Sequence, residues 1–213
     1  AGSRIYHSII PDPKEYISQQ ARTVLQTLYF TPKDSIPPVH TLRYNLRETD
    51  GISAKSGSQG NISIFYSTRH ITKSFHDADT AKVQFETRGV LFHELTHAYQ
   101  LEPQGIGTYG TNKVFWAFIE GMADAVRVAN GGFRGEADRP KGGNYMDGYR
   151  RTGYFFVWLR DTKDPDFLRK LNQSTLHIIP WSFDGAIKHI LGPQYNIDQL
   201  WYEYLLAKGD IKE

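Results

Sequence analysis

The chain has 213 residues, of which 39% are hydrophobic and 23% charged, as expected of a globular protein with one hydrophobic core. The formal net charge is only +2, and no run of Lys and Arg is long enough to indicate nucleic-acid binding. There is no cysteine, which excludes disulfides, thiolate catalysis and a Cys-ligated zinc. We therefore expect a single domain over 1–213, and any metal must be held by nitrogen and oxygen ligands.

No segment has the character of a membrane-spanning helix, because no stretch approaches 18 consecutive apolar residues. The opening residues, AGSRIYHSII, also lack the apolar core of a signal peptide. Two N-x-S sequons, at Asn61 and Asn172, are compatible with a secreted protein whose signal peptide has been removed. We thus expect a chain that does not act in a membrane.

The first half of the chain is predicted to hold a helix followed by a small sheet. Residues 10–29 place apolar side chains at helical spacing after a Pro-Asp-Pro turn. Polar and apolar residues alternate over 37–48, which predicts a strand, and the Thr-Asp-Gly of 49–51 predicts a turn. The Gly/Ser-rich residues 55–60 predict a loop, and NISIFYS at 61–67 predicts a further strand.

The strand at 61–67 has two interpretations that stay open. It is either an inner strand or the sheet edge beside a cleft, where an extended peptide could add as an extra strand. Residues 77–101 then predict one long helix, with Asp79 or Thr80 near its N-cap.

The second half is predicted to be mainly helical. A loop at 102–113 precedes a helix at 114–130, which ends at a Gly-Gly pair suited to a C-cap. A polar, Gly-rich loop at 131–144 follows, and further helices are predicted at 145–159, 165–172, 181–191 and 197–207. The expected fold is α+β: a small N-terminal mixed sheet with a long helix (about 10–101) and a mainly helical part (102–213).

The predicted helix at 77–101 contains VLFHELTHAYQ, in which His93, Glu94 and His97 form the pattern H-E-x-x-H. Both histidines lie on one face of such a helix, so two imidazole nitrogens can bind one ion about 2 Å away. Glu94 lies about 100° around the helix and can act on water at the ion without being a ligand. The pattern indicates a zincin-type zinc site.

A catalytic zinc normally has three protein ligands, so a third must come from another element. The arrangement H-E-x-x-H-x-x-G-x-x-H is excluded, because Gln100 and Pro103 stand at its Gly and last His positions. The next predicted helix offers Glu120 and Asp124, four residues apart and therefore on one face. We predict Glu120 as the third ligand and Asp124 as the acceptor for the distal N–H of one histidine. Two alternatives stay open: Asp124 as the ligand, or both carboxylates in surface ion pairs.

A tetrahedral oxyanion would need a donor besides the metal. Candidates lie in the segment NYMDGYRRTGYFF, namely Tyr145, Tyr149, Arg150 and Tyr154. Tyr149 is our first choice.

Four segments give the chain a family resemblance: VLFHELTHAYQ, FIEGMADAVR, DGYRRTGYFFVWL and IDQLWYEYL. With H-E-x-x-H-x-x-Q followed by E-G-x-A-D-x-x-R, the chain resembles the basic secretory protein family of plants and microbes, which is grouped with gluzincin-type zinc metallopeptidases. The resemblance implies His93, His97 and Glu120 as ligands, Glu94 as the general base, and Tyr149 at a family Gly-Tyr position. It also implies secretion and, in plants, a role in defence.

The expected function is that of a zinc-dependent metallopeptidase, with endopeptidase activity preferred. Its partner would be a peptide or protein substrate, with no nucleic acid and no membrane, and the chain would act as a monomer. The alternatives are a catalytically idle zinc-containing defence or binding protein, and a glycan-directed peptidase or lectin-like module. The high content of Tyr and Trp suggests the glycan-directed alternative.

Overall fold

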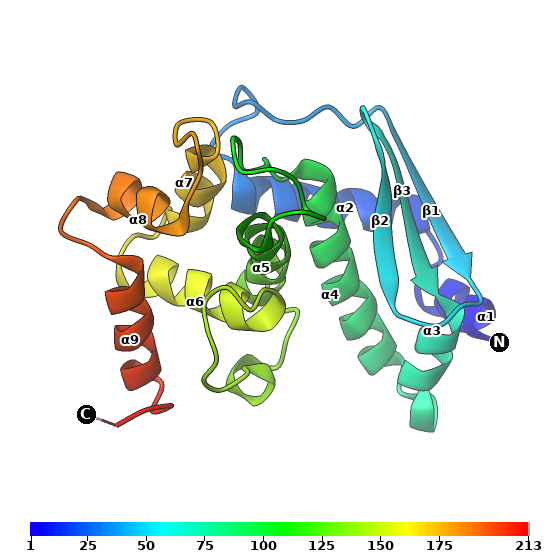
Figure 1. Ribbon diagram of the computed structural model, residues 1–213. Helices are drawn as coiled ribbons and strands as arrows, with labels where there is room; N and C mark the ends of the chain where they lie inside the picture. The colour runs from blue at the N-terminus through cyan, green and yellow to red at the C-terminus, as the bar shows by residue number, and fades with distance from the viewer. Residues whose placement is uncertain (213) are drawn as a thin grey trace.

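The computed structural model describes residues 1–212 and has the predicted α+β fold. A small sheet lies at one end of the molecule, and helices make up most of the rest (Figure 1). The described helices are α1 (Gly2–Ile9), α2 (Pro13–Leu28), α3 (Thr68–Ser74), α4 (Thr80–Tyr99), α5 (Lys113–Ala129), α6 (Tyr149–Thr162), α7 (Phe167–Ser174), α8 (Phe183–Leu191) and α9 (Ile197–Ala207), with short 3-10 turns η1 (His76–Ala78) and η2 (Gly135–Asp138).

The sheet contains β1 (Thr41–Arg47), β2 (Ser53–Ser58) and β3 (Asn61–Ser67) in the order β1-β3-β2. β3 is parallel to β1 and antiparallel to β2, so the sheet is mixed, as predicted. β3 is therefore the inner strand, and the interpretation of 61–67 as a sheet edge is wrong. The edge beside α4 is formed by β2 (Figure 1).

The prediction of a loop at 55–60 is wrong, because β2 extends to Ser58 and the turn covers only the next two residues. The sequence of β2, SAKSGS, has little intrinsic preference for a strand, and it is held by backbone pairing with β3. Gly57 has φ 91°, and a Cβ there would come within 2.0 Å of the Asn61 carbonyl oxygen. Tertiary pairing thus overrides the local preference for a loop.

The two helices next to the sheet, α1 and α3, have no counterpart among the sequence predictions. Each has only seven or eight residues, too short for a clear apolar period. Several predicted helices begin later than expected, among them α4 at Thr80, where the Asp79 side chain accepts from the Lys82 N–H, and α6 at Tyr149.

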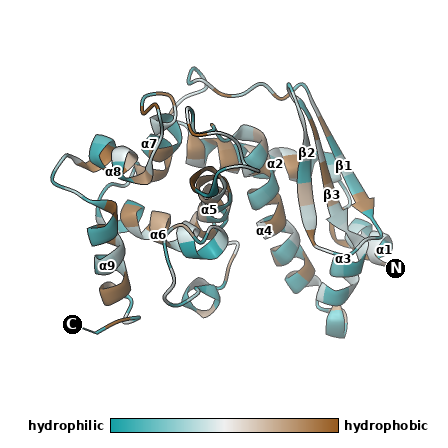
Figure 2. Cartoon of the chain, viewed as in Figure 1, coloured by the Kyte–Doolittle hydropathy of each residue, from teal (hydrophilic) through white to brown (hydrophobic). Residues whose placement is uncertain are grey.

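The main hydrophobic cluster lies around α5, which is mostly apolar and packs between α4 and α6 (Figure 2). A Cβ on Gly121 would lie 2.3 Å from Thr152 of α6, and one on Gly153 would lie 2.7 Å from the Ala125 nitrogen. These two glycines therefore allow α5 and α6 to pack closely. Because α5 is rigidly enclosed, its polar residues that face α4 are held in place.

Asn172 lies in the core and connects three elements. Its side chain accepts from the Leu101 N–H and donates to the Leu28 carbonyl, and none of it is exposed. Of the two sequons, only Asn61 is exposed.

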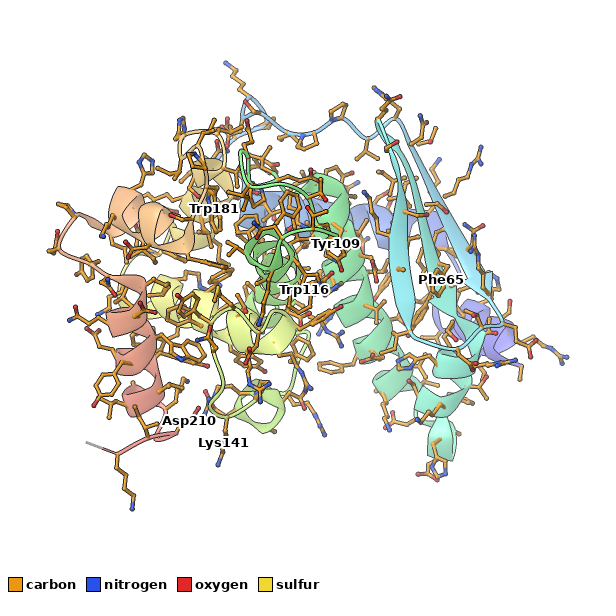
Figure 3. The ribbon with its side chains drawn as sticks, viewed as in Figure 1. Phe65, Tyr109, Trp116, Lys141, Trp181 and Asp210 are labelled. Atoms are coloured by element: carbon orange, nitrogen blue, oxygen red, sulfur yellow. The ribbon has the colours of Figure 1, made fainter. Side chains whose placement is uncertain are left out.

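The C-terminal segment is joined to the η2 loop by a buried ion pair. Arg139 donates two hydrogen bonds to Asp210, both 2.8 Å, and the Gly142 N–H donates to the same carboxylate. The Arg139 and Asp210 side chains are only 3% and 1% exposed. Figure 3 shows Asp210 beside Lys141 at the edge of the molecule near the C-terminus. We call the pair of Arg139 and Asp210 the C-terminal clasp.

Asp210→Asn is expected to lower the free energy of unfolding by about 3 kcal/mol at pH 7, because it leaves Arg139 buried with a single, exposed carboxylate partner, Glu136. The hydrogen bond from Arg139 lowers the pKa of Asp210 to about 2. The clasp should therefore stabilise the fold above the usual Asp pKa near 4 and lose this effect as the pH falls toward 2. Urea unfolding at pH 7 and pH 3 tests this. Asp161→Asn, which breaks an exposed pair, is the control, and an equal loss in both variants would contradict the prediction.

None of the helices in residues 1–212 combines the length and apolar character that crossing a bilayer requires.

Candidate metal centre

Three side chains from two helices meet between α4 and α5. His93 and His97 lie one turn apart on α4, and Glu120 lies on α5. The two histidine Nε2 atoms are 3.0 Å apart, and Glu120 Oε2 lies 3.2 Å from that of His93 and 3.5 Å from that of His97. These three could hold a metal ion.

The spacing of these three atoms fits a zinc ion. Zinc takes His nitrogen and carboxylate oxygen at about 2.0–2.2 Å, so two ligands of a tetrahedral site lie about 3.3–3.6 Å apart. The observed separations of 3.0, 3.2 and 3.5 Å are within about 0.3 Å of that range. Glu120 Oε2 is buried and meets the geometry of a hydrogen bond with neither histidine, despite its closeness to both. A cation is the partner that all three atoms can share.

Both histidine rings are fixed by a second contact. His93 Nδ1 lies 2.7 Å from Asp124 Oδ1, one turn after Glu120 on α5. His97 Nδ1 lies 2.9 Å from the Gln100 side-chain amide, which is buried. An acceptor such as Asp124 sets the tautomer and direction of a metal-binding imidazole, whereas the Gln100 amide nitrogen holds the direction of the His97 ring.

Tyr109 contacts Glu120 from the loop between α4 and α5. Its hydroxyl donates to Glu120 Oε1 at 2.6 Å, so the other oxygen, Oε2, faces the histidines. This loop is tied to the start of α5: the Asn112 N–H donates to the Thr108 carbonyl, and the Asn112 side chain caps the helix. Figure 3 shows Tyr109 between α4 and α5, near Trp116.

The centre carries an excess of negative charge. Burial lowers the pKa of His93, but its contacts with Asp124 and Glu120 outweigh burial and raise that pKa to about 10. Burial raises the pKa of Glu120, whereas the two histidines hold it well below its ordinary value. The Glu120 carboxylate is thus ionised and favours a bound cation.

Glu94 is 5% exposed and lines the cleft that contains the centre, an open space of about 1470 Å³. Its place next to His93 on α4 brings it beside the three converging atoms without making it one of them. Its role as the general base stays a prediction.

Tyr149 also lines the cleft, and 47% of it is exposed. Its ring lies parallel to that of His93, with the ring centres 6.0 Å apart, and contacts Trp116 edge-on. Its φ of 45° is uncommon for a residue other than glycine, and such backbone strain is concentrated at functional sites. The preceding Gly148 is needed because a Cβ there would lie 2.7 Å from the Trp116 ring.

The structure brings together His93, Glu94, His97, Glu120, Asp124 and Tyr149, although their roles stay predictions. Of the other candidates for the oxyanion donor, Arg150 lines the cleft, whereas Tyr145 and Tyr154 do not. The residues that sequence analysis missed are Tyr109 and Gln100. Tyr109 gave no signal, because its loop has no periodicity and the fold alone brings it to Glu120. Sequence analysis assigned Gln100 no role beyond excluding a third histidine and completing the family pattern H-E-x-x-H-x-x-Q, although its position three residues after His97 places it on the same helical face.

The chain matches the model of a known protein family. The family model BSP, described as "Peptidase of plants and bacteria", matches residues 1–204. The chain belongs to this family. The match covers every residue of the centre, and the family is one of peptidases. No curated protein and no solved structure gives a significant match to the chain.

Proposed function

We propose that the protein is a zinc-dependent endopeptidase with His93, His97 and Glu120 as the metal ligands. The observation that supports this most directly is the convergence of two imidazole nitrogens and one carboxylate oxygen at separations suited to a tetrahedral zinc. Membership of a peptidase family supports the reaction class. When bound, zinc supplies Lewis acidity, which polarises a carbonyl and lowers the pKa of water.

The chain's own residues have distinct roles in this proposal. Glu94 accepts a proton from the attacking water and passes it to the leaving amine. Asp124 and Gln100 hold the two histidine rings in one orientation, and Tyr109 does the same for Glu120. Tyr149 remains our choice of donor to the oxyanion.

The open form of the cleft supports an endopeptidase. Residues of β2 line one side of it, and the sheet leaves that strand's outer edge unpaired within residues 1–212. We propose that the substrate pairs with this edge as an additional strand. The sequence had left this role open for the strand at 61–67. Because the cleft continues to both sides of the centre, a chain can extend past the scissile bond in both directions.

The test of this function is the zinc content of the purified protein together with cleavage of a broad peptide library. We expect one zinc per chain, hydrolysis that stops on treatment with a chelator, and recovery when zinc is returned. A protein that lacks zinc affinity would overturn the proposal. Zinc binding without turnover of any peptide would instead favour an idle binding protein, and cleavage of glycosylated peptides alone would favour the glycan-directed alternative.

Tyr109→Phe is expected to weaken zinc binding about tenfold and to leave the fold intact. The substitution removes only the hydroxyl that holds Glu120 Oε1, and Tyr109 is 46% exposed, so little packing is lost. Zinc affinity is measured by competition with a chromogenic chelator. Tyr202→Phe, at an equally exposed tyrosine of α9, is the control. Unchanged affinity would show that the packing of α5 alone orients Glu120.

A further inference from the structure

The cleft extends along α4 well beyond the metal centre. Its lining on that helix runs from Lys82 to His97. At a rise of 1.5 Å per residue, Lys82 lies about 16 Å along the helix from His93, roughly the span of five extended residues. The cleft toward the N-terminal end of α4 thus has room for several substrate side chains on one side of the scissile bond.

Two of the cations in this part of the cleft are neutralised within the protein. Arg127 pairs with Glu86 at 2.9 Å, and its guanidinium lies 4.1 Å from the centre of the Phe133 ring. Arg134 pairs with Asp138 at 2.7 Å. These pairs contribute little net charge to the cleft.

Three further cations line the cleft without a neutralising partner. Lys55 of β2, Lys82 of α4 and Arg150 of α6 have no carboxylate within 4 Å among the described residues. They come from three different walls, and Arg150 is steadied by donating to the Asp138 backbone carbonyl at 3.2 Å. We call these three residues the cationic arm.

The carboxylates that line the cleft leave these three cations without a neutralising partner. Outside the centre they are Glu86 and Asp138, both paired, and Glu102, which lies past the C-terminal end of α4. The cleft of residues 1–212 is therefore positive on one side of the metal centre and not on the other.

We propose that the cationic arm binds acidic side chains, so that the enzyme prefers substrates with Asp or Glu on the side of the scissile bond toward the N-terminus of α4. This inference rests on the proposed peptidase function. Each exposed pair contributes modestly and is screened by salt over about 8 Å at physiological ionic strength. Three together should give roughly a tenfold preference in kcat/KM, expressed mainly in KM, because the arm lies away from the reacting bond.

The experiment compares peptides that differ only by Glu and Asp against Gln and Asn. The test protein carries Lys55→Gln, Lys82→Gln and Arg150→Gln. A control carries Arg4→Gln, Lys33→Gln and Lys73→Gln, all exposed positions outside the cleft, so that both proteins change from a net charge of +2 to −1. Binding of the same peptides to a Glu94→Gln protein, measured by fluorescence anisotropy, gives a readout that does not need catalysis.

We expect the parent and the control to prefer the acidic peptides about tenfold at 50 mM salt and less at 500 mM. The test protein should show a preference of about twofold or less, measured as the ratio of its kcat/KM values for the acidic and the neutral peptides. A parent without preference, or a test protein that retains it, would overturn the inference while leaving the peptidase function standing. Binding of acidic peptides without hydrolysis by the parent would support the cationic arm and overturn the peptidase function. Selective binding of an anionic oligosaccharide would overturn the inference by assigning the arm to a glycan.

Discussion

Glu94→Gln should lose nearly all peptide hydrolysis, with kcat/KM reduced about 10²–10⁴-fold, and should still bind one zinc per chain. The amide has the shape of the carboxylate but cannot accept the proton of the attacking water. Because Glu94 is not one of the three converging side chains, the zinc ligands are unchanged. Hydrolysis of a fluorogenic peptide and zinc content measured on the same preparation check both parts.

The matched control is Glu102→Gln, which makes the same change at another glutamate of the same cleft, beyond the end of α4. It should retain the activity of the parent on neutral peptides. Full activity in Glu94→Gln would contradict the mechanism, and loss of zinc in that variant would instead give Glu94 a part in holding the metal.

Glu120→Ala should weaken zinc binding far more than Asp124→Asn does. The first substitution removes one of three ligand atoms, whereas the second leaves an oxygen that can still accept from His93 Nδ1. Complete loss of such an outer contact typically weakens metal affinity about 10–100-fold. Asp124→Asn, which keeps an acceptor for His93, should weaken zinc affinity by no more than that. Chelator competition gives the zinc affinities, and circular dichroism shows whether each variant is folded.

The same pair of variants distinguishes the two ligand assignments left open by the sequence. If Glu120→Ala bound zinc as tightly as the parent, the ligand would be Asp124. In the structure it is Glu120 Oε2 that approaches both Nε2 atoms, whereas Asp124 reaches the far nitrogen of His93. The reverse result would therefore require both helices to rearrange on metal binding.

Sequence analysis predicted the α+β class and the helices that carry the centre, because local periodicity and capping residues determine those features. H-E-x-x-H fixes the relation between His93 and His97 within a single helix, and the spacing of Glu120 and Asp124 does the same on the next helix. Which carboxylate faces the metal depends on how α4 and α5 pack, and the sequence left that open.

Features that depend on distant contacts escaped prediction. The polar strand β2 exists because β3 is available to pair with it, not because of its own residues. The contact of Tyr109 with Glu120 depends on the path of an aperiodic loop, and the cationic arm is assembled from three elements that are far apart in the sequence. Such relations require the fold.

Asn172, whose amide joins α7 to the carbonyl of Leu28 and the N–H of Leu101, has a consequence for biosynthesis. An oligosaccharide on that nitrogen is too large for a site with no exposure, so the glycosylated sequon and the native packing exclude each other. In a host that glycosylates nascent chains, modification at Asn172 would compete with folding and divert chains to degradation. The yield of active protein would then depend on the expression host, although nothing at the metal centre differs.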